Sequence, residues 1–134
     1  MTNFNLEIVT PQKVILKEEA TMVIARTIVG DIGILANHAP LVTELALGEM
    51  KIKHGDKEKD FFISGGFLEI SKDKVLILAD KAINAKDIDI EKEKEEKELY
   101  EAKLKKLSED REIATTQQAL KESLKKIELG SRRY

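Results

Sequence analysis

Residues 59–79 read KDFFISGGFLEISKDKVLILA, and this stretch decides the fold of the first part of the chain. It contains three short apolar runs, separated by the turn-forming clusters Ser64-Gly65-Gly66 and Ser71-Lys72-Asp73-Lys74. Short apolar runs bounded by such clusters are typical of β-strands. A phosphate-binding loop would need a longer glycine pattern with a lysine and a following helix, so we predict a turn or bulge at the two glycines.

The same pattern extends over residues 1–84, which hold six of the seven glycines, both prolines and all four phenylalanines. Further short apolar runs lie at residues 4–8, 14–16, 22–29, 41–45 and 49–53. Eight or more short strands with a turn every 8–12 residues predict a β-sandwich or barrel.

Residues 85–134 differ, because they are rich in Lys, Glu, Leu and Ala and contain no proline. Asp87 or Asp89 can cap a first helix, and Ser108 can cap a second helix that ends at Gly130 as its C′ residue. The second helix has a narrow apolar seam at positions 113, 117, 120, 124 and 127. Residues 86–98 carry a net charge of −3 and residues 111–134 a net charge of +3, which favours an antiparallel pair. Because apolar side chains are few, we expect this hairpin to depend on whatever it packs against.

Composition excludes several classes of function. The 134 residues carry a net charge of −2 and include no cysteine, so neither nucleic-acid binding nor a thiolate metal site is expected. We see no signal peptide and no apolar run near the ~20 residues that span a bilayer, so we expect a soluble intracellular protein with no membrane insertion of its own.

The stretch Gly30–Pro40, GDIGILANHAP, contains the one candidate for chemistry, Asp31 with His38. A catalytic pair would need an orienting third group, and a metal site would need more ligands than His54 could add. The alternative is a shaped loop, since Gly30 and Gly33 permit backbone torsions closed to other residues. We favour the loop, and keep a small enzyme that uses Asp31 and His38 as an alternative.

Two stretches together resemble one family. The pattern Gly-acid-apolar-Gly followed by His-x-Pro, over residues 30–40, resembles a signature of the epsilon subunit of bacterial F-type ATP synthases. Residues 62–70, continuing into 75–80, resemble its second signature. The order of the motifs, their spacing and the helical hairpin behind them match over the whole chain.

This resemblance implies a ten-stranded β-sandwich over residues 1–84 and a mobile two-helix antiparallel hairpin over residues 85–134. It implies a non-catalytic subunit of the central stalk, peripheral at the cytoplasmic face of the membrane, that takes part in ATP synthesis and ion transport. The sandwich would bind the gamma subunit and the rotor c-ring, with Asp31 and His38 at that end. The hairpin would switch between a folded state and an extended state that contacts the alpha and beta subunits and opposes ATP hydrolysis. Cations expected to meet an acidic segment of beta are Arg111, Lys121, Lys125, Lys126, Arg132 and Arg133.

Some family members bind ATP at the hairpin through Ile/Leu-Asp-x-x-Arg-Ala. The corresponding residues are Ile88, Asp89, Lys92 and Glu93, so a lysine replaces the arginine and an acid replaces the alanine. Loss of the guanidinium fork and an added acid near phosphates both argue against tight ATP binding. We therefore expect no required cofactor, and keep ATP binding at this weak remnant of the motif as an alternative. A further alternative is self-association through the seam over residues 113–127 as a coiled coil.

Overall fold

The computed structural model describes residues 2–106 and 110–132. It divides the chain into two compact units, Met1–Asn84 and Ala85–Tyr134, which we describe separately. Neither of the two described α-helices is long and apolar enough to cross a membrane.

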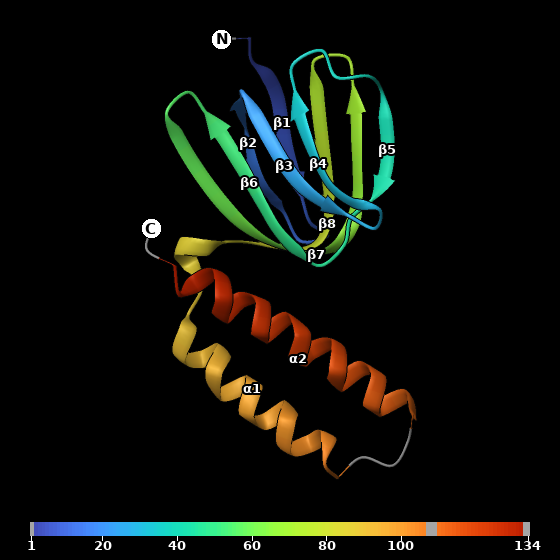
Figure 1. Cartoon of the computed structure of the whole chain (residues 1–134), viewed down its shortest axis with the longest axis vertical. Helices are drawn as coiled ribbons and strands as arrows, with labels where there is room; N and C mark the ends of the chain where they lie inside the picture. Colours follow the sequence, from blue (N-terminus) through green and yellow to red (C-terminus); the bar gives the residue numbers. More distant parts are fainter. Residues whose placement is uncertain (1, 107–109, 133–134) are drawn as a thin grey trace. The chain divides into compact units, whose positions relative to one another are not determined.

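The first unit is built from eight strands, which Figure 1 shows as two facing layers. They are β1 (Phe4–Val9), β2 (Val14–Ala20), β3 (Met22–Thr27), β4 (Gly30–Leu35), β5 (Leu41–Glu44), β6 (Gly48–His54), β7 (Lys57–Ser71) and β8 (Lys74–Asn84). The β-sandwich expected from the sequence is confirmed, but the strand count of ten is wrong for the described residues.

The difference in count has a physical reason, because β7 and β8 are long enough to belong to both layers. The first layer runs β2-β1-β8-β7-β5, using residues 74–79 of β8 and 66–71 of β7. The second runs β4-β3-β6-β7-β8, using residues 57–63 of β7 and 81–84 of β8. Each layer therefore has five strand segments, and two of the strands are shared. β1 and β8 run parallel, whereas the other pairs are antiparallel.

The corner of β7 lies at Gly65 and Gly66, whose φ angles are +67° and +109°. Ser64 pairs with Lys81 and Gly66 with Ala79, so the register is the same on both sides of the corner and no extra residue is inserted. A Cβ on Gly66 would collide with the carbonyl oxygen of Leu78. The predicted turn or bulge is thus wrong, because the strand continues and bends where glycine alone permits the torsions.

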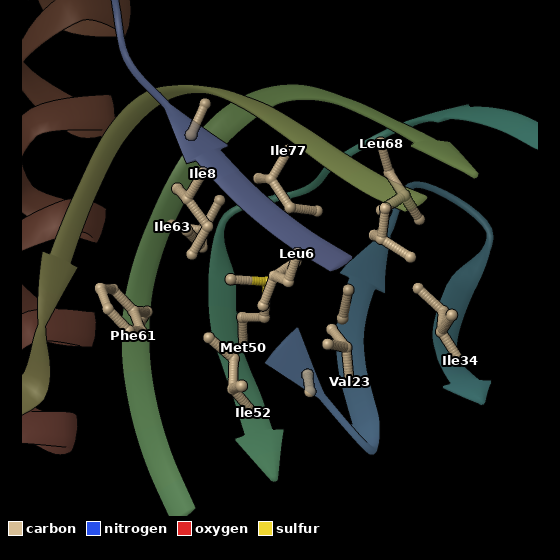
Figure 2. Close-up of a cluster of buried hydrophobic side chains, with 14 of the residues drawn as sticks. Leu6, Ile8, Val23, Ile34, Met50, Ile52, Phe61, Ile63, Leu68 and Ile77 are labelled. Atoms are coloured by element: carbon tan, nitrogen blue, oxygen red, sulfur yellow. The ribbon is translucent and has the colours of Figure 1, made fainter. Parts of the chain in front are cut away.

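The core lies between the two layers and is filled from both sides (Figure 2). Side chains alternate between core and exterior along each strand, as the burial of Phe4, Leu6 and Ile8 on β1 illustrates. The labelled core residues of Figure 2 are Leu6, Ile8, Val23, Ile34, Met50, Ile52, Phe61, Ile63, Leu68 and Ile77. Burying one such side chain stabilises the fold by about 1.5–3 kcal/mol.

Strand β4 occupies most of the stretch that was expected to be one shaped loop, so that interpretation is wrong. Asn37 is left-handed at φ 65° and Gly30 has φ 120°, as their residue types predict. Gly33 has no positive φ, and it lies within the strand opposite Ile24.

The second unit contains a short 3₁₀ helix, η1 (Ala85–Asp87), followed by α1 (Ile90–Leu104) and α2 (Asp110–Gly130). α1 and α2 are antiparallel, since the beginning of α1 meets the end of α2 (Figure 1). Asp89 is the N-cap of α1, and its carboxylate accepts a hydrogen bond of 3.1 Å from the Lys92 backbone N–H. This confirms one of the two predicted caps, whereas Ser108 lies outside the described residues.

The inner face of α2 differs from the predicted seam. Leu124, a member of that seam, is 43% exposed, whereas Thr116, Ser123 and Leu129 are buried. Gly130 is helical rather than a left-handed C′ residue. A Cβ there would lie 3.0–3.3 Å from side-chain atoms of Ile88 and Ile90, so its small size lets the two helix ends approach closely.

Candidate docking surfaces

The outer side of the first layer carries large apolar side chains that face solvent. Val42 on β5 is 69% exposed, Phe67 on β7 is 53% exposed and Leu78 on β8 is 46% exposed. Phe67 lies opposite Leu78 in the register, and Leu78 lies opposite Val9 of β1. We call Val9, Val42, Phe67 and Leu78 the apolar face.

The apolar face is a shallow groove rather than a flat surface. A depression of about 430 Å³ lies at the bend of the layer, with Val9, Phe67 and Leu78 among its lining residues. Exposed acids surround it, because Glu44 is opposite Phe67, Asp80 follows on β8, and Glu69 is opposite Val42. Clustered apolar side chains with a charged rim are characteristic of surfaces that bind another protein.

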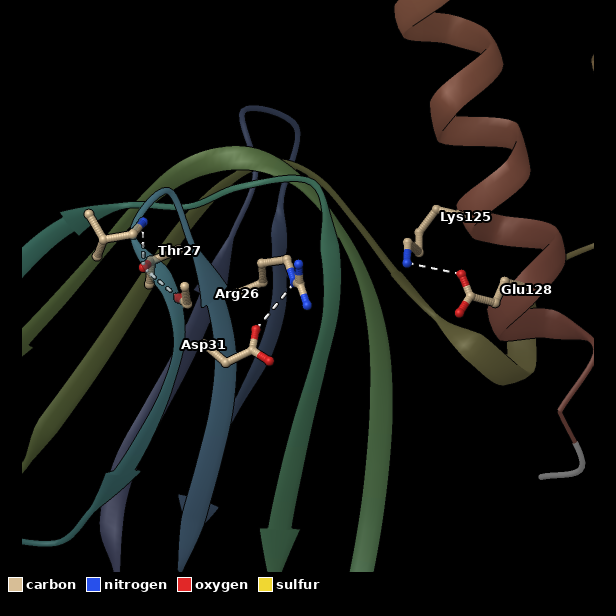
Figure 3. Close-up of polar contacts among 7 residues, drawn as sticks. Arg26, Thr27, Asp31, Lys125 and Glu128 are labelled. Carbon is tan, nitrogen blue, oxygen red and sulfur yellow. Dashed lines mark hydrogen bonds and ion pairs between the residues drawn. The ribbon is translucent and has the colours of Figure 1, made fainter.

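The turn between β3 and β4 is a second exposed apolar feature. Ile28 and Val29 at its tip are 60% and 87% exposed. The Thr27 hydroxyl braces the turn, since it donates to the Gly30 carbonyl at 2.7 Å and accepts from the Val29 N–H at 3.2 Å (Figure 3). The Ile28 N–H donates to the Glu44 carbonyl at 3.1 Å, which joins this turn to the end of β5 beside the apolar face.

Asp31 and His38 are not brought together. Asp31 lies beside the β3–β4 turn, where its carboxylate is 3.2 Å from Nε of Arg26 (Figure 3). His38 follows the other end of β4, and its Nδ1 lies 2.7 Å from the Ala39 carbonyl oxygen. The strand from Asp31 to Leu35 alone spans about 13 Å, so the two side chains cannot act as one acid–base pair. The described residues also contain no group of three side chains suited to a metal ion.

The predicted cations of α2 differ in how they are engaged. Arg111 and Lys121 are exposed. Lys125 on α2 and Arg132 just after its end both contact Glu128 of α2, at 2.9 and 3.7 Å, and Figure 3 shows the first of these pairs. Lys126 contacts Glu93 of α1 instead, at 3.4 Å. Arg133 lies outside the described residues.

The residues that correspond to the ATP motif have other contacts within the hairpin. The Asp89 carboxylate is used as the cap of α1, and Ile88 packs against Gly130. Glu93 places a carboxylate against Lys126, so a phosphate would meet an acid at this end of the hairpin. Lys92 carries the remaining charge of the motif, on an exposed position of α1.

Sequence reasoning missed the apolar face and the β3–β4 tip. A signal existed, because residues 75–79, VLILA, are apolar at every position instead of alternating. A continuous apolar run marks a strand that has apolar side chains on both faces.

The comparisons agree with the architecture. A family model described as the beta-sandwich domain of the ATP synthase delta/epsilon chain matches residues 3–85. The sodium ion specific ATP synthase epsilon chain of Propionigenium modestum is 55% identical over 130 residues, which are 97% of this chain and 95% of the relative. The ATP synthase epsilon chain of Brevibacillus brevis is 47% identical over 105 residues, 78% of this chain and 80% of the relative.

Solved structures agree as well. A chain of the Euglena gracilis mitochondrial ATP synthase, described as OSCP/F1/c-ring, has a TM-score of 0.78 at 28% identity, over 90% of this chain and 76% of that one. A chain of the Tetrahymena thermophila central stalk and c-ring shares the fold, with a TM-score of 0.54 at 19% identity over 63% of this chain and 68% of that one. The family resemblance in the sequence is therefore confirmed, and the chain belongs to the epsilon chains of ATP synthase.

Proposed function

We propose that this chain is a non-catalytic part of the rotor stalk that joins the catalytic head of an ATP synthase to its membrane ring. The observation that supports the proposal is the apolar face, an exposed apolar groove on the β-sandwich that a partner protein could cover. In this assignment the chain lies at the cytoplasmic face of the membrane as a peripheral subunit. The sandwich holds fixed partners, and the hairpin regulates.

The gamma subunit is the proposed occupant of the apolar face. A permanent partner is expected to cover a broad apolar surface, whereas transient partners use smaller and more polar ones. The exposed acids Glu44, Glu69 and Asp80 favour a gamma segment with apolar side chains at its centre and lysine or arginine at its edges. His38 precedes β5, which carries Val42, so we assign His38 to the edge of this contact.

The rotor ring is the proposed partner of the β3–β4 tip. Ile28 and Val29 project from a hydrogen-bonded turn, and the Arg26–Asp31 pair stands next to them. A narrow apolar tip with adjacent charges suits the small loops of a ring better than a broad face does. We therefore assign Asp31 to the contact with the ring, and we no longer assign His38 to that contact.

The hairpin is the proposed regulator of hydrolysis. In the extended state, Arg111, Lys121, Lys125, Lys126 and Arg132 would meet the acidic segment of beta. Single exposed ion pairs contribute at most about 1 kcal/mol, so several must act together. A complete shift of a two-state equilibrium takes ~5.5 kcal/mol of differential binding, which a handful of such contacts approaches.

Exchanging Phe67 for glutamate tests the sandwich assignment. A charge at the centre of the apolar face would be buried against gamma, and we expect the affinity for purified gamma to fall about 30-fold, the loss that accompanies a binding hot spot. Leu35→Glu is the matched control, because Leu35 is 57% exposed on β4 of the other layer. Both variants should keep the unfolding temperature of the unmodified chain, since both side chains face solvent. Equal affinity of the two variants for gamma would contradict the assignment.

A further inference from the structure

Among the described residues of the helical unit, Glu93 and Lys126 form an ion pair that joins α1 to α2. Oε1 of Glu93, in the first turn of α1, lies 3.4 Å from Nζ of Lys126 near the end of α2. The side chains of Glu93 and Lys126 are 9% and 14% exposed. The pairs Lys97–Glu101 and Lys125–Glu128 each lie within a single helix, and Arg132, just after the end of α2, contacts Glu128 of that helix.

Burial makes the cross-helix pair different in kind from the others. Two charges removed from water are tolerated only when each compensates the other, and loss of one partner leaves an uncompensated charge. Within the described part of the chain, the second carboxylate oxygen of Glu93 has no hydrogen-bond partner. The burial of the Glu93 carboxylate therefore depends on the contact between Oε1 and Lys126.

Little else in α1 can replace this contact. Residues 91–98 include no apolar residue, so these two turns of α1 contribute no apolar side chain to the contact with α2. At the same end of the hairpin, the side chains of Ile88 and Ile90 pack against Gly130. The apolar contact and the ion pair lie within about one turn of each other, and we treat them as one closing point.

We propose that Glu93 is an internal competitor for Lys126, which holds the hairpin folded and withholds this lysine from an acidic partner surface. In the folded hairpin the ammonium group is neutralised by the neighbouring helix. In the opened hairpin its contact with Glu93 is broken, and the ammonium group can pair with a carboxylate of the partner. The acidic partner and Glu93 thus compete for one cation. The proposal rests on the proposed regulatory function, and it names the contact that sets the equilibrium between the folded and the open hairpin.

The other cations do not have this property. Lys125 keeps Glu128 as a neighbour whether the hairpin is folded or open, because both lie on α2, and Arg132, which follows the end of α2, contacts the same acid. Opening the hairpin breaks the contact between Lys126 and Glu93, whereas the Lys125–Glu128 pair does not depend on the other helix.

Glu93→Gln and Glu128→Gln form a matched pair of variants, since each neutralises one acid that contacts α2 cations. Spin labels at cysteines introduced at exposed positions 99 and 117 would report the separation of the helices in the isolated full-length chain, which has no cysteine of its own. We expect Glu93→Gln to raise the ratio of open to folded hairpin about tenfold, the effect of losing a charge-assisted hydrogen bond. Glu128→Gln should leave the ratio within about twofold of the unmodified chain. Equal distance distributions for the two variants would overturn the proposal.

A charge exchange provides the second test. The double variant Glu93→Lys with Lys126→Glu should restore the folded fraction that Lys126→Glu alone loses, because an opposite pair again faces across the helices. A double variant that stays as open as Lys126→Glu would overturn the proposal. These distance measurements use the isolated chain, so their failure would leave the stalk assignment and its gamma-binding test untouched.

Discussion

The bend of β7 gives the sharpest stability prediction, through the exchange Gly66→Ala. Gly66 has φ +109°, and holding a residue with a side chain in such a region costs about 1–3 kcal/mol. The new methyl group would also overlap the Leu78 carbonyl oxygen and would lie 2.8 Å from the Ala79 Cα. Backbone atoms cannot rotate away, so overpacking adds about 1–3 kcal/mol more.

The sum is a loss of about 2–6 kcal/mol in the free energy of unfolding of the sandwich. A domain of this size loses roughly 4–8 °C in unfolding temperature for each kcal/mol, so we expect a decrease on the order of 20 °C. Calorimetry or circular dichroism of the full chain measures it. Gly33→Ala is the control, because Gly33 has no positive φ and its added Cβ would lie 3.7 Å from Met22 Cε, an ordinary contact. If Gly66→Ala unfolded at the same temperature as Gly33→Ala, the reasoning about the bend would be refuted.

Three further predictions concern the hairpin. Asp89→Ala removes the carboxylate that accepts from Lys92 N–H, and should lower the stability of α1 by about 1 kcal/mol, seen as an earlier loss of helical circular dichroism on heating; an unchanged melting curve would argue against the cap. Titration calorimetry with ATP should give no binding heat at micromolar protein, since Asp89 and Glu93 are both engaged; saturable heat would show that the motif remnant still works. Sedimentation should give a monomer at all accessible concentrations, because Ile113, Leu120 and Ile127 of the predicted seam are already partly buried within the chain while Leu124 is exposed, so the seam does not form one exposed face; a dimer would revive self-association.

Most strands could be predicted because their side chains alternate between core and solvent, as at Phe4, Leu6 and Ile8. β4 could not, since its two glycines are typical of a loop, and it becomes a strand by pairing with β3. The bend at Gly65-Gly66 was visible in the sequence as a break. The sequence does not show that the chain passes from one layer to the other at this point, because the passage depends on pairing with residues far away in the sequence, in β5, β6 and β8.

The sites were predictable to a lesser degree. Residue types alone limited the cap of α1 to Asp87 or Asp89, because capping is a local property, and the structure has Asp89. The inner face of α2 was predicted from apolar spacing, yet Thr116 and Ser123 are buried and Leu124 is exposed, since packing partners decide which face turns inward. Asp31 and His38 are far apart because most of β4 lies between them. The sequence predicted a loop there, and a loop could have brought the two side chains together.

The rate of ATP hydrolysis by the assembled synthase tests the central claim most directly, with the hairpin deleted at residues 88–134. The sandwich is a compact unit with its own core, so assembly with gamma and the ring should persist. We expect hydrolysis to rise several-fold while the truncated chain still co-purifies with the complex. An unchanged hydrolysis rate in an intact complex would contradict the claim that the hairpin restrains the enzyme.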